Sequence, residues 1–385
     1  MREDWDIRLF KEVFDLQMGK TPDRKNFSLF EGDNTWVSIK DLDGKYISSS
    51  KECISDEAAK NIKLVKRGTV IMSFKLTVGK TAIAGKDLYT NEAIMAFNLR
   101  NGYDIDASFL YYYLKNYRWE GSNKAVMGIT LNKATISKHK IAIPPKPTQL
   151  SIVTELDKIN ELIRIKKEQL KDYDTLAQSI FYEMFGDPVE NEKGWEVMSL
   201  GDICEITSSK RVFANEYVDM GVPFYRSKEV IEKSKQLPIS VELYISESHY
   251  DKIKSSFGVP QIGDILVTAV GTIGKIWVVD TNEPFYFKDG NLVWLRKIKG
   301  VHSEYFRYSL FYLIDEYKKV NANGAAYNAL TIAKLKLMLC PLPPLSLQQS
   351  FAHKIEQIER QKAAVQRTIK DLETLLAARM QYWFE

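Results

Sequence analysis

Two turns that each carry a lysine are candidates for a phosphate-binding site. Gly79-Lys80-Thr81 and Gly274-Lys275 each follow a β-branched run, as the end of a phosphate-binding loop does. Such a loop opens with a glycine five residues earlier, which lets its backbone wrap the phosphate. Phe74 and Ala269 hold that position here, and no Ser or Thr follows Lys275 to bind magnesium. Both segments are therefore predicted to be strand turns with an exposed lysine.

A second candidate is the tetrapeptide Asn282-Glu283-Pro284-Phe285, which differs at one residue from the N-P-P-F motif with which amino-methyltransferases hold a flipped adenine. The first half of the chain has no counterpart, and no glycine-rich nucleoside loop accompanies it, so we interpret it as a loop. The four histidines form no i, i+4 pair, and there is no G-x-S-x-G motif. The three cysteines lie far apart and are expected in the core. The sequence predicts no catalytic residue and no metal site.

Basic residues gather instead in loops that recur in both halves of the chain. Lysine and arginine neutralise phosphates, and an arginine on a loop can reach guanine edges in the major groove. Any single such loop can be a solvated surface, but recurrence in both halves favours a shared function. Arg226 is the preferred base reader, because it follows the β-like run Val222-Pro223-Phe224-Tyr225. The candidate DNA-contacting residues are Lys20, Arg24, Lys25, Lys40, Lys80, Lys124, Lys210, Arg211, Arg226, Lys228, Lys275 and Tyr327.

Composition limits the class of protein. A chain of 385 residues with 45% hydrophobic residues is long enough for two or more folded domains. No run approaches the ~18 apolar residues of a membrane span, and the first residues lack the apolar stretch of a signal peptide, so a cytoplasmic protein without a membrane partner is expected. The net charge is +4, which is a weak indication of a polyanionic partner that must bind through local basic patches.

Two long segments must position these loops. Residues 148–186 and 347–385 carry apolar residues at steps of three and four, interrupted in the first segment only by Lys166 and Ala177. This is a heptad stripe without Gly or Pro over most of its length, and it predicts a helix roughly 57 Å long. Because each stripe needs a partner, the two helices are expected to pair as an antiparallel coiled coil. The alternative is that each packs only on its own globular domain.

The long segments repeat together with the parts that precede them, which indicates an internal duplication with a pseudo-twofold relation. We predict an α+β fold with domains at 1–147 and 187–346, each of mixed β/α structure and each followed by a long helix. Matched positions include the two glycine turns, Leu99 with Leu295, and Gln149 with Gln348. Each domain should hold a hairpin around its glycine turn, a Tyr- and Phe-rich helix (108–117 or 303–318), and a closing strand that ends in a proline pair. The aromatic helix ends are expected to cap the coil on the opposite domain or to form a partner patch; they are Phe181, Tyr182, Phe185, Tyr382, Trp383 and Phe384.

Three passages resemble the specificity subunit of type I restriction–modification enzymes: GKTPDRKNFSLFEGDNTWVSIKDL, the GTIGK turn and ALTIAKLKLMLCPLPPLSLQQSFAHKIEQI. The resemblance is strengthened because motifs of these kinds follow one another in this order in both halves of the chain. The resemblance covers essentially the whole chain. It implies a non-catalytic subunit with two target recognition domains, which read the two halves of a bipartite double-stranded DNA target while the paired helices act as a spacer. It also implies two methyltransferase subunits and two restriction or motor subunits as partners. No cofactor is expected in this chain, since S-adenosylmethionine, ATP and magnesium would bind to the partners.

Two other functions compete with this interpretation. The chain could be a stand-alone nucleic-acid-modifying enzyme with a degenerate methyltransferase motif at residues 282–285. It could also be a regulatory scaffold that has kept the fold but binds no DNA. Because the basic loops of the two domains differ, Lys20-Thr21-Pro22 against Lys210-Arg211-Val212, two different half-sites are expected.

Overall fold

The computed structural model describes residues 5–119, 123–125, 128–321 and 329–385, without the side chains of 123–125 and 128–130. Two compact units make up the chain: the first comprises Met1–Glu168 with Gln366–Glu385, and the second comprises Gln169–Val365. The boundary between these units falls inside both long helices. In the described part of the chain, no helix is both long enough and apolar enough to span a membrane.

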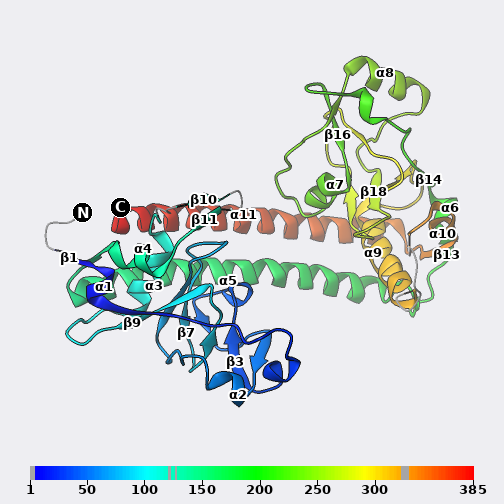
Figure 1. The fold of residues 1–385 in the computed structure, drawn as a ribbon. Coiled ribbons are helices and arrows are strands. Elements are labelled where there is room, and N and C mark those ends of the chain that lie inside the picture. Colours follow the sequence, from blue (N-terminus) through cyan, green and yellow to red (C-terminus); the bar gives the residue numbers. More distant parts are fainter. Residues whose placement is uncertain (1–4, 120–122, 126–127, 322–328) are drawn as a thin grey trace. The chain divides into compact units, whose positions relative to one another are not determined.

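The long helices are α5 (Lys146–Phe185) and α11 (Leu345–Phe384), each of 40 residues, drawn in green and in orange to red in Figure 1. Each starts directly after a proline pair, where a buried glutamine fixes the first turn. Gln149 donates to the carbonyl of Pro144 (2.9 Å) and accepts from the backbone of Asp106 (2.8 Å). Gln348 makes the equivalent pair of 2.8 Å bonds with Pro343 and His302. Asp106 and His302 are the N-caps of α3 (Ala107–Asn116) and α9 (Ser303–Val320), so the matched glutamines join the start of each long helix to the start of the aromatic helix of its unit.

The two helices run antiparallel in both units. In the first unit, Lys167 of α5 forms an ion pair with Glu373 of α11 at 2.8 Å, and Glu155 pairs with Arg379. In the second unit, Asp174 pairs with Lys362 at 2.8 Å, and the rings of Phe181 and Phe351 lie 5.6 Å apart. Residue numbers rise along α5 as they fall along α11, which confirms the predicted antiparallel pairing.

The heptad stripe predicted the buried face of the first part of each helix, but the buried positions near the end of α5 differ from it. Ile152 and Leu156 are completely buried, and Phe351 and Ile355 match them in α11. Ala177, which interrupts the sequence pattern, is only 3% exposed and belongs to the core of the second unit. A helix of 3.6 residues per turn drifts against a seven-residue repeat, so the contact line moves to Ala177 and its neighbours at this end.

The first unit contains a five-stranded sheet of order β2-β9-β6-β7-β4 and a three-stranded sheet of order β5-β3-β8. Two antiparallel strand pairs complete it: β1 with β12, which are distant in sequence, and the hairpin β10-β11. Its strands are β1 Asp6–Leu9, β2 Phe14–Met18, β3 Asn34–Val37, β4 Tyr46–Ile47, β5 Glu52–Ile54, β6 Val70–Ser73, β7 Thr81–Ala84, β8 Tyr89–Thr90, β9 Ile94–Leu99, β10 Asn123–Ala125, β11 Gly128–Thr130 and β12 Lys140–Ile143. Its shorter helices are α1 Phe10–Val13, η1 Phe27–Phe30, η2 Ile39–Asp41, α2 Asp56–Ala59, α3 Ala107–Asn116 and α4 Lys133–Lys138.

The second unit repeats this plan with two four-stranded sheets, β14-β21-β18-β19 and β15-β17-β16-β20, and the pair β13-β22. Its strands are β13 Val197–Ser199, β14 Glu205–Thr207, β15 Tyr217–Val218, β16 Val222–Tyr225, β17 Tyr244–Ile245, β18 Ile265–Thr268, β19 Ile276–Val278, β20 Tyr286–Phe287, β21 Leu292–Arg296 and β22 Leu339–Pro341. Its shorter helices are α6 Leu200–Ile203, η3 Ala214–Glu216, α7 Ser227–Ser234, α8 Glu247–Ser256, α9 Ser303–Val320 and α10 Ile332–Leu337. The predicted hairpins, the aromatic helices and the closing strands all occur in both units.

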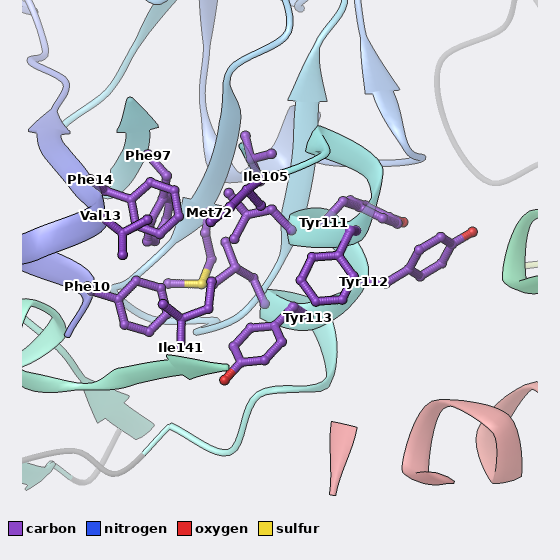
Figure 2. Close-up of a cluster of buried hydrophobic side chains, with 14 of the residues drawn as sticks. Phe10, Val13, Phe14, Met72, Phe97, Ile105, Tyr111, Tyr112, Tyr113 and Ile141 are labelled. Atoms are coloured by element: carbon purple, nitrogen blue, oxygen red, sulfur yellow. The ribbon is translucent and has the colours of Figure 1, made fainter. Parts of the chain in front are cut away.

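The core of the first unit lies between its large sheet and α3. Figure 2 shows Phe10, Phe14 and Phe97 on one side of Met72 and the tyrosines of α3 on the other. Phe10 and Phe14 are at most 1% exposed, and their ring centroids lie 5.7 Å apart. Burial of this many aromatic rings is the main stabilising contribution in such a core.

The strand pairings correct one sequence alignment. Val70 pairs with Phe97 in the first unit, and Ile265 pairs with Leu295 in the second. Val70 and Ile265 match, since they lie equally far before the two glycine turns, so Phe97 and not Leu99 corresponds to Leu295. A shift of two residues keeps every side chain on the same face of a strand, which is why the sequence pattern did not reveal it.

The aromatic residues at the helix ends were predicted either to pack on the opposite domain or to form a patch for a partner. Most of them are buried against a domain core. Phe181 and Phe185 are at most 2% exposed in the core of the second unit. Trp383 and Phe384 are half-buried against the core of the first unit. Tyr182 and Tyr382 remain 41% and 56% exposed. Each unit thus takes part of its core from the C-terminal end of a long helix, α5 in the second unit and α11 in the first.

Candidate nucleic-acid interface

In the first unit, several predicted residues lie on loops at one edge of the large sheet. Because its strands β2, β9, β6 and β7 are antiparallel, the ends of β2 and β6 meet the starts of β9 and β7. Lys20 lies just after β2, and Lys80 lies just before β7. The loops are joined there, since the Gly19 amide donates to Ile94 (3.3 Å) and the Phe74 amide donates to Ala93 (2.9 Å). This edge therefore presents cations from separate parts of the chain.

The three-stranded sheet brings a further loop to the same edge. The Asn91 amide donates to the carbonyl of Val37, where β3 ends (3.0 Å), and the Lys20 amide donates to Thr90 at 2.9 Å. Trp36 lies beneath, with its indole N–H donating to the Lys20 carbonyl at 3.1 Å. Lys40 lies shortly after β3 and is exposed. The lysines at positions 20, 25, 40 and 80 form no ion pair with the described part of the chain.

Arg24 is held differently from these lysines. Its guanidinium donates to both carboxylate oxygens of Glu52, one bond being 3.0 Å, and it lies 4.4 Å from the ring centroid of Phe30. The hydrogen bonds from Arg24 lower the pKa of the Glu52 carboxyl. Glu52 lies in β5, so this ion pair fixes the Arg24 loop to the small sheet.

The second unit repeats the arrangement at the matching edge. Lys210 and Arg211 follow β14, and Lys275 directly precedes β19. The Lys210 amide donates to the Tyr286 hydroxyl (2.6 Å), while its ammonium lies 4.7 Å from the ring centroid of Phe257. Arg211 pairs with Asp289 at 2.7 Å, just before β21. The structure thus brings together Lys210, Arg211 and Lys275 as it brings together Lys20 and Lys80.

Arg226 and Lys228 form ion pairs with two glutamates, Glu229 and Glu242. Arg226 pairs with Glu229 (2.9 Å) and Glu242 (2.8 Å), and Lys228 also pairs with Glu242 (2.7 Å). The two cations lower the pKa of Glu242 to about 2. Glu229 is only 1% exposed, and it also accepts from the Arg226 amide at 2.8 Å. Arg226 follows β16 as expected, but its guanidinium is engaged within the protein.

The residues that sequence reasoning missed are therefore carboxylates. Glu52, Glu242 and Asp289 orient arginines or lysines that are distant in sequence. Only Glu229, three residues after Arg226, had a local signal, since this spacing is that of a helix-capping pair.

Two predicted residues have side chains that are not described. Lys124 lies in β10, which pairs with β11 through its backbone. Tyr327 lies outside the described residues.

The near-matches to catalytic motifs have structural roles. Both glycine turns connect antiparallel strands, β6 with β7 and β18 with β19, so no helix follows them as it does in a phosphate-binding loop. Phe285 of the tetrapeptide is 3% exposed and stacks on Tyr225 with centroids 4.8 Å apart. That ring is therefore unavailable to a flipped base.

Comparison with known proteins decides the family. The model described as "Type I restriction modification DNA specificity domain" matches residues 2–172 and 192–374, one match for each half of the chain. The chain belongs to this family. The internal duplication is thus a duplication of the specificity domain.

Relatives and solved structures agree with this assignment. The type I restriction enzyme MjaIX specificity subunit of Methanocaldococcus jannaschii is 28% identical over 60% of this chain and 59% of the relative. A putative specificity subunit of Haemophilus influenzae is 28% identical over 66% of this chain and 65% of the relative. The matches span less than two thirds of the length of these two relatives.

The fold is similar to that of two solved structures. One comes from work on complex assembly and conformational transition of the type I R-M system (TM-score 0.63, 21% identity, 100% of this chain and 98% of that one). The other is the S subunit from M. genitalium (TM-score 0.53, 15% identity, 99% and 96%). The fold is therefore that of an S subunit, with two mixed α/β domains and paired long helices.

Proposed function

We propose that this chain is the DNA sequence-specificity subunit of a type I restriction–modification complex. It reads a bipartite and asymmetric DNA target, with one half-site for each domain. The observation that carries the proposal is the repeated sheet edge, where loops joined by hydrogen bonds carry lysines at matched positions, Lys20 with Lys210 and Lys80 with Lys275, that form no ion pair with any described residue. An edge of this kind fits the phosphate backbone, while neighbouring loop residues reach bases.

In this proposal, catalysis belongs to partner subunits. Two methyltransferase subunits and two restriction or motor subunits assemble with the chain in the cytoplasm, and S-adenosylmethionine, ATP and magnesium bind to those partners. The names of the relatives and the family membership support such partners. The stand-alone methyltransferase has no support, because the aromatic residue of its tetrapeptide is buried against Tyr225. The non-binding scaffold gives no reason for the matched lysines.

One experiment separates these possibilities. The chain is purified alone and with the methyltransferase subunit encoded beside it, and each sample is incubated with DNA and labelled methyl donor. We expect methylation of a bipartite motif by the complex and none by the chain alone. Turnover by the isolated chain would refute a purely sequence-reading role.

The role of the sheet edge is tested with matched lysine variants of the complex. Lys20→Ala and Lys210→Ala should each weaken binding to all sequences and reduce the slope of log affinity against log salt by about one unit. Lys11→Ala and Lys299→Ala are the controls, because these exposed lysines lie at the opposite ends of strands β2 and β21. Equal effects of the edge and control variants would contradict the proposed interface.

A further inference from the structure

Leu76 has an unusual backbone conformation for a branched apolar residue. Its φ is +62°, in the left-handed region. The other non-glycine residues with positive φ in the described part of the chain are Asn191, Gln236 and Lys297, all polar. For L-residues this region brings Cβ close to the following carbonyl oxygen, which makes it unfavourable. A leucine in this position therefore needs an explanation.

The matching turn of the second unit shows that the fold does not require a leucine here. In both turns a hydroxyl at the end of the strand, Ser73 or Thr268, donates to the carbonyl four residues on. The same hydroxyl accepts from the Lys80 amide (3.1 Å) or the Lys275 amide (2.9 Å). The residue that corresponds to Leu76 is Gly271, with φ +72°. Glycine adopts this conformation without strain, so the same turn forms more easily in the second unit.

Burial does not compensate for the strain at Leu76. The side chain is 68% exposed, while Phe74, two residues earlier, is 1% exposed in the core. Burial of Phe74 anchors the turn. Two backbone hydrogen bonds add to this: the Phe74 amide donates to the carbonyl of Ala93, and the Leu131 amide donates to the carbonyl of Phe74 (3.0 Å). Gly79 has φ +90°, and an added Cβ would lie 3.7 Å from the Trp119 ring. The turn is thus held on several sides while Leu76 points into solvent.

Lysines flank Leu76 in its turn, and one carboxylate, that of Glu92, lies within electrostatic range of Lys75. Lys80 is exposed in the same turn, and the ammonium of Lys75 lies 5.5 Å from the Phe74 ring centroid. The turn belongs to the edge that also carries Lys20, since Phe74 and Gly19 bind adjacent residues, Ala93 and Ile94. An exposed leucine between lysines suits a ligand that offers an apolar group between negative charges. In the DNA major groove that group is the thymine methyl.

We propose that Leu76 contacts a thymine methyl in the half-site read by the first unit, and that Gly271 leaves the second unit without such a contact. This inference rests on the proposed DNA-reading function and adds a specificity-determining residue to it. Lys80 and its neighbours hold the phosphates, and the leucine distinguishes thymine from bases that lack a methyl group at this place.

The test uses the complex of this chain with its methyltransferase subunit. The DNA duplexes carry, in unmethylated form, the motif that this complex methylates. Each thymine of both half-sites is replaced in turn by deoxyuridine, which removes only the methyl group. We expect the wild-type complex to lose about fourfold in affinity at one position of the first half-site, the equivalent of one buried methyl group. Leu76→Gly and Leu76→Asn should abolish that difference and leave the other positions unchanged.

Two variants are used because both accept the left-handed conformation. Glycine copies the second unit, and asparagine keeps a side chain of similar size. We expect neither to lower the melting temperature of the chain. Retention of the thymine preference by both variants, or no deoxyuridine effect in the first half-site, would overturn the inference. If the complex bound no DNA motif at all, the proposed function itself would fail, which is a distinguishable result.

Discussion

Phe384, the last residue of α11, packs against Phe109 of α3 with the ring centroids 5.8 Å apart. Its ring is also 5.8 Å from that of Tyr113, edge to face. Met380, one turn earlier, belongs to the same core and is 9% exposed. The core of the first unit is therefore complete only when the C-terminal end of α11 packs against α3.

We predict that Phe384→Ser destabilises the first unit by about 1–3 kcal/mol, because Phe384 is half-buried and its loss leaves a gap beside Phe109. Native-state hydrogen exchange of the α3 amides should report this loss, while protection in α9 stays constant. Tyr382→Ser is the control, since Tyr382 is 56% exposed, and it should cost clearly less. Equal losses in α3 and α9 would contradict a local role.

The second unit depends in the same way on Phe181 of α5. This ring is completely buried and stacks on Tyr308 and Tyr312 of α9 at centroid distances of 5.7 and 5.3 Å. We predict that Phe181→Ala costs about 3–5 kcal/mol and exposes the α9 amides first. Tyr182→Ala, at a neighbouring 41% exposed position, should have a smaller effect. Protection that falls in α3 rather than α9 would show that the assignment is wrong.

Periodic features of the fold could be predicted from the sequence. The heptad stripes indicated two long helices, and the β-branched runs around Gly79 and Gly274 indicated hairpins, because these patterns are local. The lysines beside the turns were found for the same reason. The alignment of Leu99 with Leu295 was two residues off, since a strand pattern repeats every two residues.

Contacts between distant segments could not be predicted. Nothing near Arg24 in the sequence indicates that Glu52 neutralises it, and nothing near Arg226 indicates Glu242. Whether an exposed-looking arginine is available to DNA depends on such partners, which only the tertiary fold supplies. The strain at Leu76 was equally hidden, because φ is not visible in a residue type.

The third prediction concerns pH. Lys228 and Arg226 lower the pKa of Glu242 to about 2, first through a hydrogen bond from Lys228. Since the folded pKa lies below the unfolded value, the pairs stabilise the fold above about pH 4.5, and this contribution is lost as pH falls towards 2. Carbon-detected NMR titration should show Glu242 ionised at pH 3.5. Lys228→Ala should raise its pKa, whereas Lys254→Ala, on the exposed surface of α8, should not. A pKa near 4.5 in the unmodified protein would refute the network.

The last prediction separates the structural and the DNA-reading roles of Arg226. Arg226→Ala leaves the buried carboxylate of Glu229 with only its backbone partner, which should cost about 1–3 kcal/mol. Arg24→Ala is the matched comparison: its partner Glu52 has a side chain that is 42% exposed, so the cost should be about 0–1 kcal/mol. Chemical denaturation that shows equal costs would contradict this difference.

A second substitution makes the DNA experiment interpretable. Glu229→Gln removes the buried charge, so the Arg226→Ala/Glu229→Gln double variant should recover at least half of the lost stability. DNA binding of this double variant is then compared with that of Glu229→Gln alone, across single-base changes in both half-sites. If Arg226 reads a base, one position of the second half-site should relax, by about 1–3 kcal/mol, and the first half-site should be unaffected. If no position relaxes, Arg226 only positions the loop after β16, and the cations of the sheet edge, Lys210, Arg211 and Lys275, are left as the DNA contacts of the second unit.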